Sequence, residues 1–237
     1  MSDPTTDRGL NEPKPRPWGA LLTVITEPTA TFQALAERPA ILPPYLLQMV
    51  AGLIGAYLLL PLTKAGIAEQ YAKAAPPGMT LALYQVVTII TLAIGALIGP
   101  WLIGTILALL ASFFAQFQGG SAGFRPYLSM IGYARVPLAV GGLIQALLMT
   151  RASSMQQAQS MNLSLAALAP DETHFVLKSL LSTINPFNVF YYALLAIGFG
   201  AVQRMRPARS ATFVGVIYVL ALGLMLVGGA VNKSRGM

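Results

Sequence analysis

The run TLALYQVVTIITLAIGALIGPWLIGTILALLASFFAQF, residues 80–117, contains no Asp, Glu, Lys, Arg or His. A helix needs about 20 apolar residues to cross the hydrocarbon core of a bilayer, so this run predicts a membrane protein. Two short helices turning at GPW, residues 99–101, are the alternative to one long helix. Such a hairpin would leave backbone groups unpaired in hydrocarbon, so we expect one long helix, kinked at Pro100.

Composition places the whole chain in the same class. Of its 237 residues, 55% are hydrophobic and 10% are charged, against about 25% charged in an ordinary soluble domain. The net charge is +7, but the Lys and Arg residues are scattered through short polar connections, which argues against nucleic acid as a partner. The absence of cysteine excludes a disulfide, a thiolate nucleophile and cysteine metal ligands.

Further apolar runs predict an all-α bundle of five transmembrane helices in a membrane domain of residues 39–232. The predicted spans are about 43–63, 80–117, 126–150, 185–203 and 211–231. The fourth starts sharply, because Asn185 is a good helix N-cap and Pro186 a good first helical residue.

Polar or amphipathic segments flank this domain. Residues 1–17 are polar and contain four prolines, which predicts a disordered tail, and residues 233–237 form a short C-terminal tail. Residues 18–38 predict an amphipathic interfacial segment in the headgroup layer. Its apolar face contains Phe32, Leu35 and Ala36. Its polar face contains Gln33, Glu37 and Arg38.

Positive charges in the short connections predict the orientation of the chain. With the N-terminus in the cytoplasm, nine Lys and Arg residues, counting Arg135, lie on the cytoplasmic side and six on the other. Arg204, Arg206 and Arg209 carry most of this bias. They are also candidate contacts for anionic lipid or for a partner, at about 1 kcal/mol each, although fixing the topology is the simpler interpretation.

The predicted spans contain no acidic residue, because all eight Asp and Glu residues lie outside them. Ion-coupled carriers commonly hold a carboxylate near the bilayer midplane, and intramembrane aspartyl proteases need two. The single histidine, His174, lies in the third connection, so an intramembrane serine protease would lack its base. We therefore expect no catalytic residue and no enzyme activity.

One cluster offers ligand chemistry. In PDETH, residues 170–174, the side chains of Asp171, Glu172 and His174 could bind a divalent metal. A tetrahedral structural site wants four ligands, and no second set is visible, so a polar cap on the following helix is the better interpretation. We expect no metal and no cofactor.

Small residues recur at the spacing that lets membrane helices approach closely. The pairs are Gly52 with Ala56, Gly95 with Gly99, Ala196 with Gly200, and Gly228 with Gly229. They either pack the spans on one another or present a face to another membrane protein or to a second copy. Internal packing is the simpler interpretation.

The run GFRPYLSMIGYARVPLAV, residues 123–140, places Arg135 and Pro137 inside the predicted third span. A guanidinium cannot lose its proton, and alone at mid-depth it would cost at least about 2.5 kcal/mol. In one arrangement a tilted helix starts near Pro126 and Arg135 snorkels to the cytoplasmic face. In the other, which we favour, residues 126–134 form an interfacial helix and the span begins at Pro137. Either makes Arg135 a candidate lipid or partner contact.

Four segments occur in an order that resembles the bacterial branch of the Yip family, the Ypt-interacting membrane proteins. They are EPTATFQALAERP (27–39), GPW (99–101), GFRPYLSMIGYARVP (123–137) and NPFNVFYYALLAIGFG (185–200). The resemblance covers about residues 20–232 and implies five spans with a cytoplasmic N-terminus. In eukaryotic members it implies binding to Rab-type GTPases.

Two short family motifs are matched in this chain. Gly99 and Pro100 match the end of an acidic-Leu-Tyr-Gly-Pro motif, while residues 96–98 are ALI, so its acidic residue and its tyrosine are missing. Gly132 and Tyr133 match a Gly-Tyr motif. The remaining positions of the resemblance are Pro137, Asn185 and Pro186.

Together these observations predict a non-enzymatic polytopic protein of the bacterial inner membrane. We expect it to act through protein or lipid contacts in membrane organisation, with membrane lipids, other membrane proteins or a second copy as partners. Two alternatives stay open: a small transporter or channel subunit, which needs a polar path through the spans, and an accessory subunit of a larger membrane complex.

Overall fold

The computed structural model describes residues 16–117, 122–170, 175–206, 208–216, 218–219 and 222–223. Within these residues the chain is all-helical and contains no β-strand, which confirms the predicted class. Three helical stretches are long and apolar enough to cross a membrane: Leu81–Phe117, Phe124–Met149 and Pro186–Gln203. A fourth candidate is the pair Pro28–Glu37 and Leu42–Leu58, bent by 119°.

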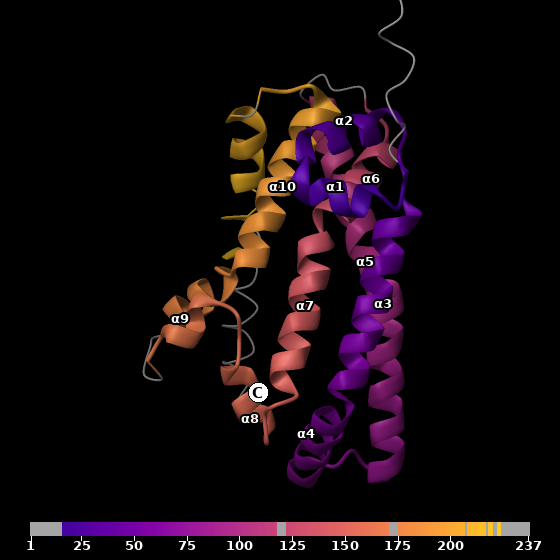
Figure 1. Ribbon diagram of the computed structural model, residues 1–237. Helices are drawn as coiled ribbons and strands as arrows, with labels where there is room; N and C mark the ends of the chain where they lie inside the picture. Colours follow the sequence, from indigo (N-terminus) through magenta and orange to yellow (C-terminus); the bar gives the residue numbers. More distant parts are fainter. Residues whose placement is uncertain are drawn as a thin grey trace, which may run out of the picture.

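Two groups of helices lie at the two ends of the molecule, and other helices connect them (Figure 1). The first end, called the α2 end below, holds α1 (Ala20–Thr26), α2 (Pro28–Glu37) and α6 (Phe124–Ala134). The opposite end, the α4 end, holds α4 (Leu60–Lys73) and α8 (Met155–Ser160). Four helices lie between the ends: α3 (Leu42–Leu58), α5 (Leu81–Phe117), α7 (Val136–Met149) and α10 (Pro186–Gln203). The short 3-10 helix η1 (Leu165–Leu168) and α9 (Phe175–Thr183) lie between α8 and α10 in the chain.

The core lies at the α2 end, where α6 packs against α2, α5 and α10. Residues 127–134 of α6 are all buried. Ser129 anchors the connection between α2 and α3, since its hydroxyl accepts from the Ala40 N–H at 3.2 Å and donates to the Ala40 carbonyl at 3.0 Å. This end is therefore held by protein packing around α6.

Helix α5 is continuous over its 37 residues with Pro100 inside it, which confirms one long helix, while the kink at Pro100 stays a prediction. Its buried residues are Gly104, Ala108, Ala111 and Ala115, which recur every three or four positions and so share one face. Small side chains on this face let α6 approach closely. The opposite face carries the large apolar side chains and is exposed.

The predicted first span, residues 43–63, is broken. Helix α3 ends at Leu58, and after Leu59 the chain enters α4, with Pro61 in its first turn. A proline usually pushes the residue before it out of the helical region, which here would be Leu60. The helix instead breaks one residue earlier, at Leu59, whose ψ is 2°. The polar connection expected after residue 63 is largely helical, as the second half of α4.

The predicted amphipathic segment, residues 18–38, also breaks, at Glu27, into α1 and α2. Phe32 and Leu35 are buried as predicted, and Gln33 and Glu37 are exposed. The apolar face of α2 packs on α6 and α10, so it is covered by protein. Its location in the headgroup layer stays a prediction.

The predicted fifth span, residues 211–231, lies largely outside the described residues, as do the tail 1–15, the segment PDETH beyond Pro170, and the tail 233–237. Residues 208–216 are helical. Among the small-residue pairs, Gly52 lies close to α5, where an added Cβ would meet the Ala96 Cβ at 3.3 Å, and Gly200 lies close to Ser210. At Gly95 and Gly99 the described residues show no internal packing, because none of their atoms lies within 4 Å of a Cβ added at either position; a face for a partner stays the alternative there.

Candidate functional site

Arg135 occupies the break between α6 and α7. Its backbone angles, φ −82° and ψ −1°, end α6 and start α7. Pro137 lies in the first turn of α7, where a missing N–H costs nothing, which confirms ARVP as a helix start. The two helices together still form one candidate span, Phe124–Met149, and α6 is buried among other helices, so the interfacial position of α6 stays a prediction.

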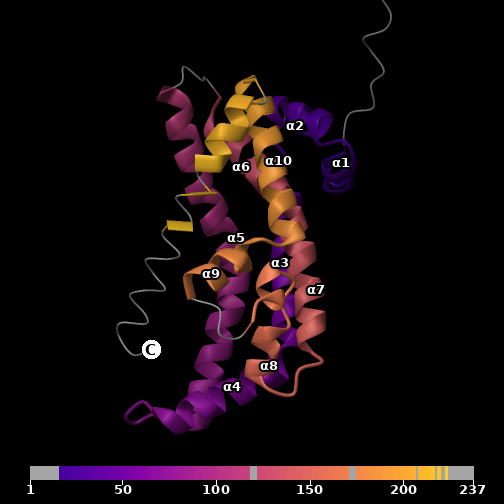
Figure 2. The same cartoon turned by 90° about the vertical axis from the view of Figure 1, so that its left-hand side faces the viewer.

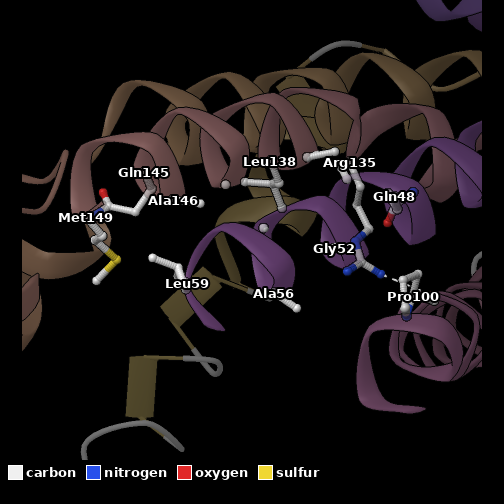
Figure 3. A pocket seen from close by; sticks show the side chains of 14 residues that line it. Gln48, Gly52, Ala56, Leu59, Pro100, Arg135, Leu138, Gln145, Ala146 and Met149 are labelled. Atoms are coloured by element: carbon white, nitrogen blue, oxygen red, sulfur yellow. Dashed lines mark hydrogen bonds between the residues drawn. The ribbon is translucent and has the colours of Figure 1, made fainter. Parts of the chain in front are cut away.

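The Arg135 side chain reaches across to α5 (Figure 3). Its Nη1 donates to the Pro100 carbonyl at 3.3 Å. No ion pair with Asp or Glu forms at Arg135 in the part of the chain that the structure describes. A guanidinium has five N–H donors, so a single long bond to a carbonyl leaves most of its hydrogen-bonding capacity unused.

Gln48, on α3, lies beside Arg135 and is 7% exposed. Its Nε2 donates to the Pro44 carbonyl at 3.0 Å and to the Gly132 carbonyl at 3.2 Å. These two carbonyl acceptors fix the orientation of the Gln48 amide, because a flipped amide would place its Oε1 against the two carbonyl oxygens. The Oε1 atom is buried and has no hydrogen-bond partner among the described residues.

Tyr45 joins the two segments that carry the short family motifs. Its ring stacks on Trp101 of α5, with centroids 4.4 Å apart and an interplanar angle of 17°, and its hydroxyl donates to the Leu128 carbonyl of α6 at 3.1 Å. Gly104 and Gly132 leave the space for the ring, since an added Cβ would lie 2.1 Å and 2.7 Å, respectively, from Tyr45 atoms. The GPW segment (99–101) and the GY segment (132–133) therefore both contact Tyr45 of α3, although about 30 residues separate them in the chain.

A groove of about 310 Å³ runs between α3 and α7 from this meeting point. The two helices lie side by side (Figure 2), and Arg135 and Gln48 line one end of the groove (Figure 3). Leu59 and Met149 line the other end. The walls between are mostly small residues, which are Ala51, Gly52, Gly55, Ala56, Ala139, Gly142 and Ala146. The arrangement is an apolar channel with one charged end.

The other predicted site residues lie apart from the groove. Tyr133 donates its hydroxyl to the Pro17 carbonyl at 2.5 Å, and Asn185 caps α10 by accepting from the Asn188 N–H at 2.8 Å, with Pro186 as the first residue. Both therefore have structural roles. Arg204, Arg206 and Arg209 are exposed beyond the end of α10.

Tyr45 and Gln48 are the residues that sequence reasoning missed. The signal was present, because PPYLLQ, residues 43–48, places a glutamine in an otherwise apolar run, and polar groups inside membrane helices need partners. The partners that fix their place in the fold, however, are residues of α5 and α6 that lie more than 50 positions away. In the described residues no group of three or more His, Cys, Asp or Glu could hold a metal.

Comparisons with known proteins cover nearly the whole chain. The model of the Yip1 domain matches residues 22–230. Over 227 residues the chain is 25% identical to a protein of Bacillus subtilis described as membrane protein YknW, covering 92% of this chain and 93% of that relative. No solved structure matches. The matched region includes α2 to α10 and therefore all of the groove.

Proposed function

The chain belongs to the Yip1 domain family of membrane proteins, and from this premise we propose that it is a non-enzymatic protein of the bacterial cytoplasmic membrane. It acts through contacts of its outer surface with lipids and with other membrane proteins. Its N-terminus lies in the cytoplasm and its C-terminus outside, because this orientation puts more Lys and Arg residues on the cytoplasmic side.

The exposed face of α5 carries this proposal. Large apolar side chains are exposed along the whole helix, among them Ile90, Ile98, Leu102, Leu109, Phe113 and Phe117, each more than 45% exposed. On a protein surrounded only by water such a face marks an interaction site. In a bilayer, lipid covers part of it.

The helix is too long for lipid to cover all of this face. Its 37 residues extend about 55 Å at 1.5 Å per residue. A tilt of about 40°, the upper end of the observed range, still projects about 42 Å along the membrane normal, against a hydrocarbon core of about 30 Å. More than about 10 Å of apolar helix surface therefore needs a covering other than lipid tails, which favours a protein contact.

Single cysteines test this proposal, because the chain has none of its own. Cysteine is introduced at Leu109 or Phe113 on the exposed face, and at Ala111 on the buried face as the control. Each variant is labelled in native membranes with a photoreactive maleimide and irradiated. We expect discrete protein adducts from the two exposed positions and none from the control. Lipid adducts alone at both exposed positions would contradict a protein contact.

The groove favours a second candidate, a small transporter subunit, because Arg135, Gln48 and Gln145 provide polar groups between two spans. Gln145 is already engaged, since its Oε1 accepts from the Leu163 N–H at 3.0 Å. Ion or solute flux in proteoliposomes that disappears in Arg135→Ala would establish transport and overturn the contact function.

A further inference from the structure

At the charged end of the groove, no acidic side chain of the described residues pairs with Arg135. Arg135 lines the groove and is partly buried, and its one hydrogen bond goes to the Pro100 carbonyl. A guanidinium removed from water is stabilised by an oppositely charged group with oxygen acceptors, for which phosphate geometry is well suited. None of the acidic residues in the described part of the chain provides that group.

The same end also holds an acceptor without a partner among the described residues. Gln48 is more than nine-tenths buried, lines the groove with Arg135, and has an unpartnered Oε1 in the described structure. Because both hydrogens of its Nε2 point at carbonyls, Oε1 is the atom of this amide that remains for a further donor at this end of the groove. A ligand for this end therefore needs an anionic group for Arg135 and an adjacent O–H or N–H for Gln48.

The rest of the groove accepts an apolar chain. From Gln48 to Leu59, α3 rises about 16 Å, and the residues that line the groove between these points are Ala51, Gly52, Gly55 and Ala56. The facing wall on α7 has the small residues Ala139, Gly142 and Ala146 together with the longer side chains of Leu138, Gln145 and Met149. Small side chains on both helices make a channel whose only charged group is at one end, which is the shape of an amphiphile.

We infer that the groove between α3 and α7 binds one phosphatidylglycerol molecule. Its phosphate accepts hydrogen bonds from Arg135, a glycerol hydroxyl of its headgroup donates to Oε1 of Gln48, and one acyl chain lies along the open groove toward Met149. This inference rests on the proposed contact function, in which membrane lipids are partners, and specifies one of them.

The headgroup chemistry makes the site selective. Phosphatidylglycerol has a net negative charge and hydroxyl donors, so it satisfies Arg135 and Gln48 together. Phosphatidylcholine has a zwitterionic headgroup whose quaternary ammonium has no N–H, so it offers Gln48 no donor and places a second cation near Arg135. The groove therefore prefers the first lipid over the second, although both have the same acyl chains.

Native mass spectrometry of the purified full-length chain, titrated with each lipid in detergent, tests this inference. We expect one retained phosphatidylglycerol per chain, bound at least tenfold more tightly than phosphatidylcholine. Arg135→Ala weakens phosphatidylglycerol binding at least tenfold, and Arg135→Lys restores part of it, because lysine retains the charge without the bidentate fork. Arg125→Ala is the matched control, since Arg125 is exposed and outside the groove.

A second variant removes the space rather than the charge. Gly142 lines the groove, and no atom of the described residues lies within 4 Å of a Cβ added there, so Gly142→Leu has room for its Cβ and directs a large apolar side chain into the groove. We expect it to lose the bound lipid and to keep its melting temperature. Gly95→Leu is the control, because Gly95 is also an open helical glycine but lies outside the groove.

Three results would overturn the inference. Equal retention of the two lipids would remove the role of the headgroup. Phosphatidylglycerol binding that is unchanged in both Arg135→Ala and Gly142→Leu would place the lipid elsewhere. Binding of inorganic phosphate that persists in Gly142→Leu and disappears in Arg135→Ala would assign Arg135 to a free anion. None of these results alters the cross-linking expected on α5, so the proposed function is tested separately.

Discussion

Gly104→Ala is the substitution whose effect the structure specifies most directly. An added Cβ would lie 2.1 Å from the Tyr45 hydroxyl oxygen and 2.6 Å and 2.7 Å from two ring carbons. The ring cannot easily move away, because it is fully buried, stacked on Trp101 and hydrogen-bonded to the Leu128 carbonyl. One methyl group therefore separates α5 from α3 or displaces Tyr45.

The magnitude follows from three contributions. Overpacking of a fully buried site costs about 3 kcal/mol, at the upper end of the usual range, because three atoms fall within van der Waals overlap. Loss of the Tyr45 hydrogen bond adds about 1 kcal/mol, and the better helix propensity of alanine returns about 1 kcal/mol. The net destabilisation is about 3 kcal/mol, which for a chain of this size lowers the melting temperature by about 6–12 °C.

Thermal unfolding in detergent, followed by loss of the monodisperse peak in size-exclusion chromatography, measures this effect. Gly95→Ala is the matched control on the same helix, because nothing lies within 4 Å of its added Cβ, and we expect it to be neutral or stabilising. In a Tyr45→Ala background, Gly104→Ala should no longer destabilise, since the clashing ring is gone. Equal melting temperatures for Gly104→Ala and Gly95→Ala would refute the packing argument.

Three further substitutions test local features. Arg204 has a left-handed backbone with φ of 52° at the end of α10, so Arg204→Gly should stabilise the fold by about 1 kcal/mol, whereas Arg206→Gly, which removes the same charge, should not. Asn185→Ala removes the cap of α10 and should cost about 1 kcal/mol, while Asn185→Asp retains it; both are read as shifts in melting temperature. Tyr133→Phe breaks the bond to the Pro17 carbonyl, costs about 1 kcal/mol, and should speed proteolysis of the N-terminal segment relative to wild type.

Several elements of the fold follow from local sequence alone. The uncharged run 80–117 predicted α5 almost to the residue, because backbone groups in hydrocarbon must be paired within one helix. Asn185 and Pro186 predicted the start of α10, and ARVP predicted the start of α7, because capping and proline preferences act within one turn. These signals are short-range, so no knowledge of the tertiary fold is needed to use them.

The errors arise where packing decides between similar local signals. Residues 43–63 have the composition of a single span, yet the chain breaks at Leu59 and continues as α4. Gly95 and Gly99 have the spacing of a packing motif, but no neighbouring atom lies within 4 Å of an added Cβ at either position, while Gly104 on the same helix contacts Tyr45. Spacing identifies a small-residue face, and only the position of the neighbouring helix determines whether that face is used.

The amino-acid sequence by itself determined that this protein is an all-helical membrane protein of the Yip family with Arg135 as its unusual charge, because hydropathy, capping and the absence of intramembrane carboxylates are properties of single segments. Only the tertiary structure decided what surrounds that charge. Gln48, Pro100 and Arg135 are separated by dozens of residues and become neighbours through the packing of α3, α5 and α7. The groove exists because small residues on two helices face each other, and a pairing between helices is not encoded in either helix alone.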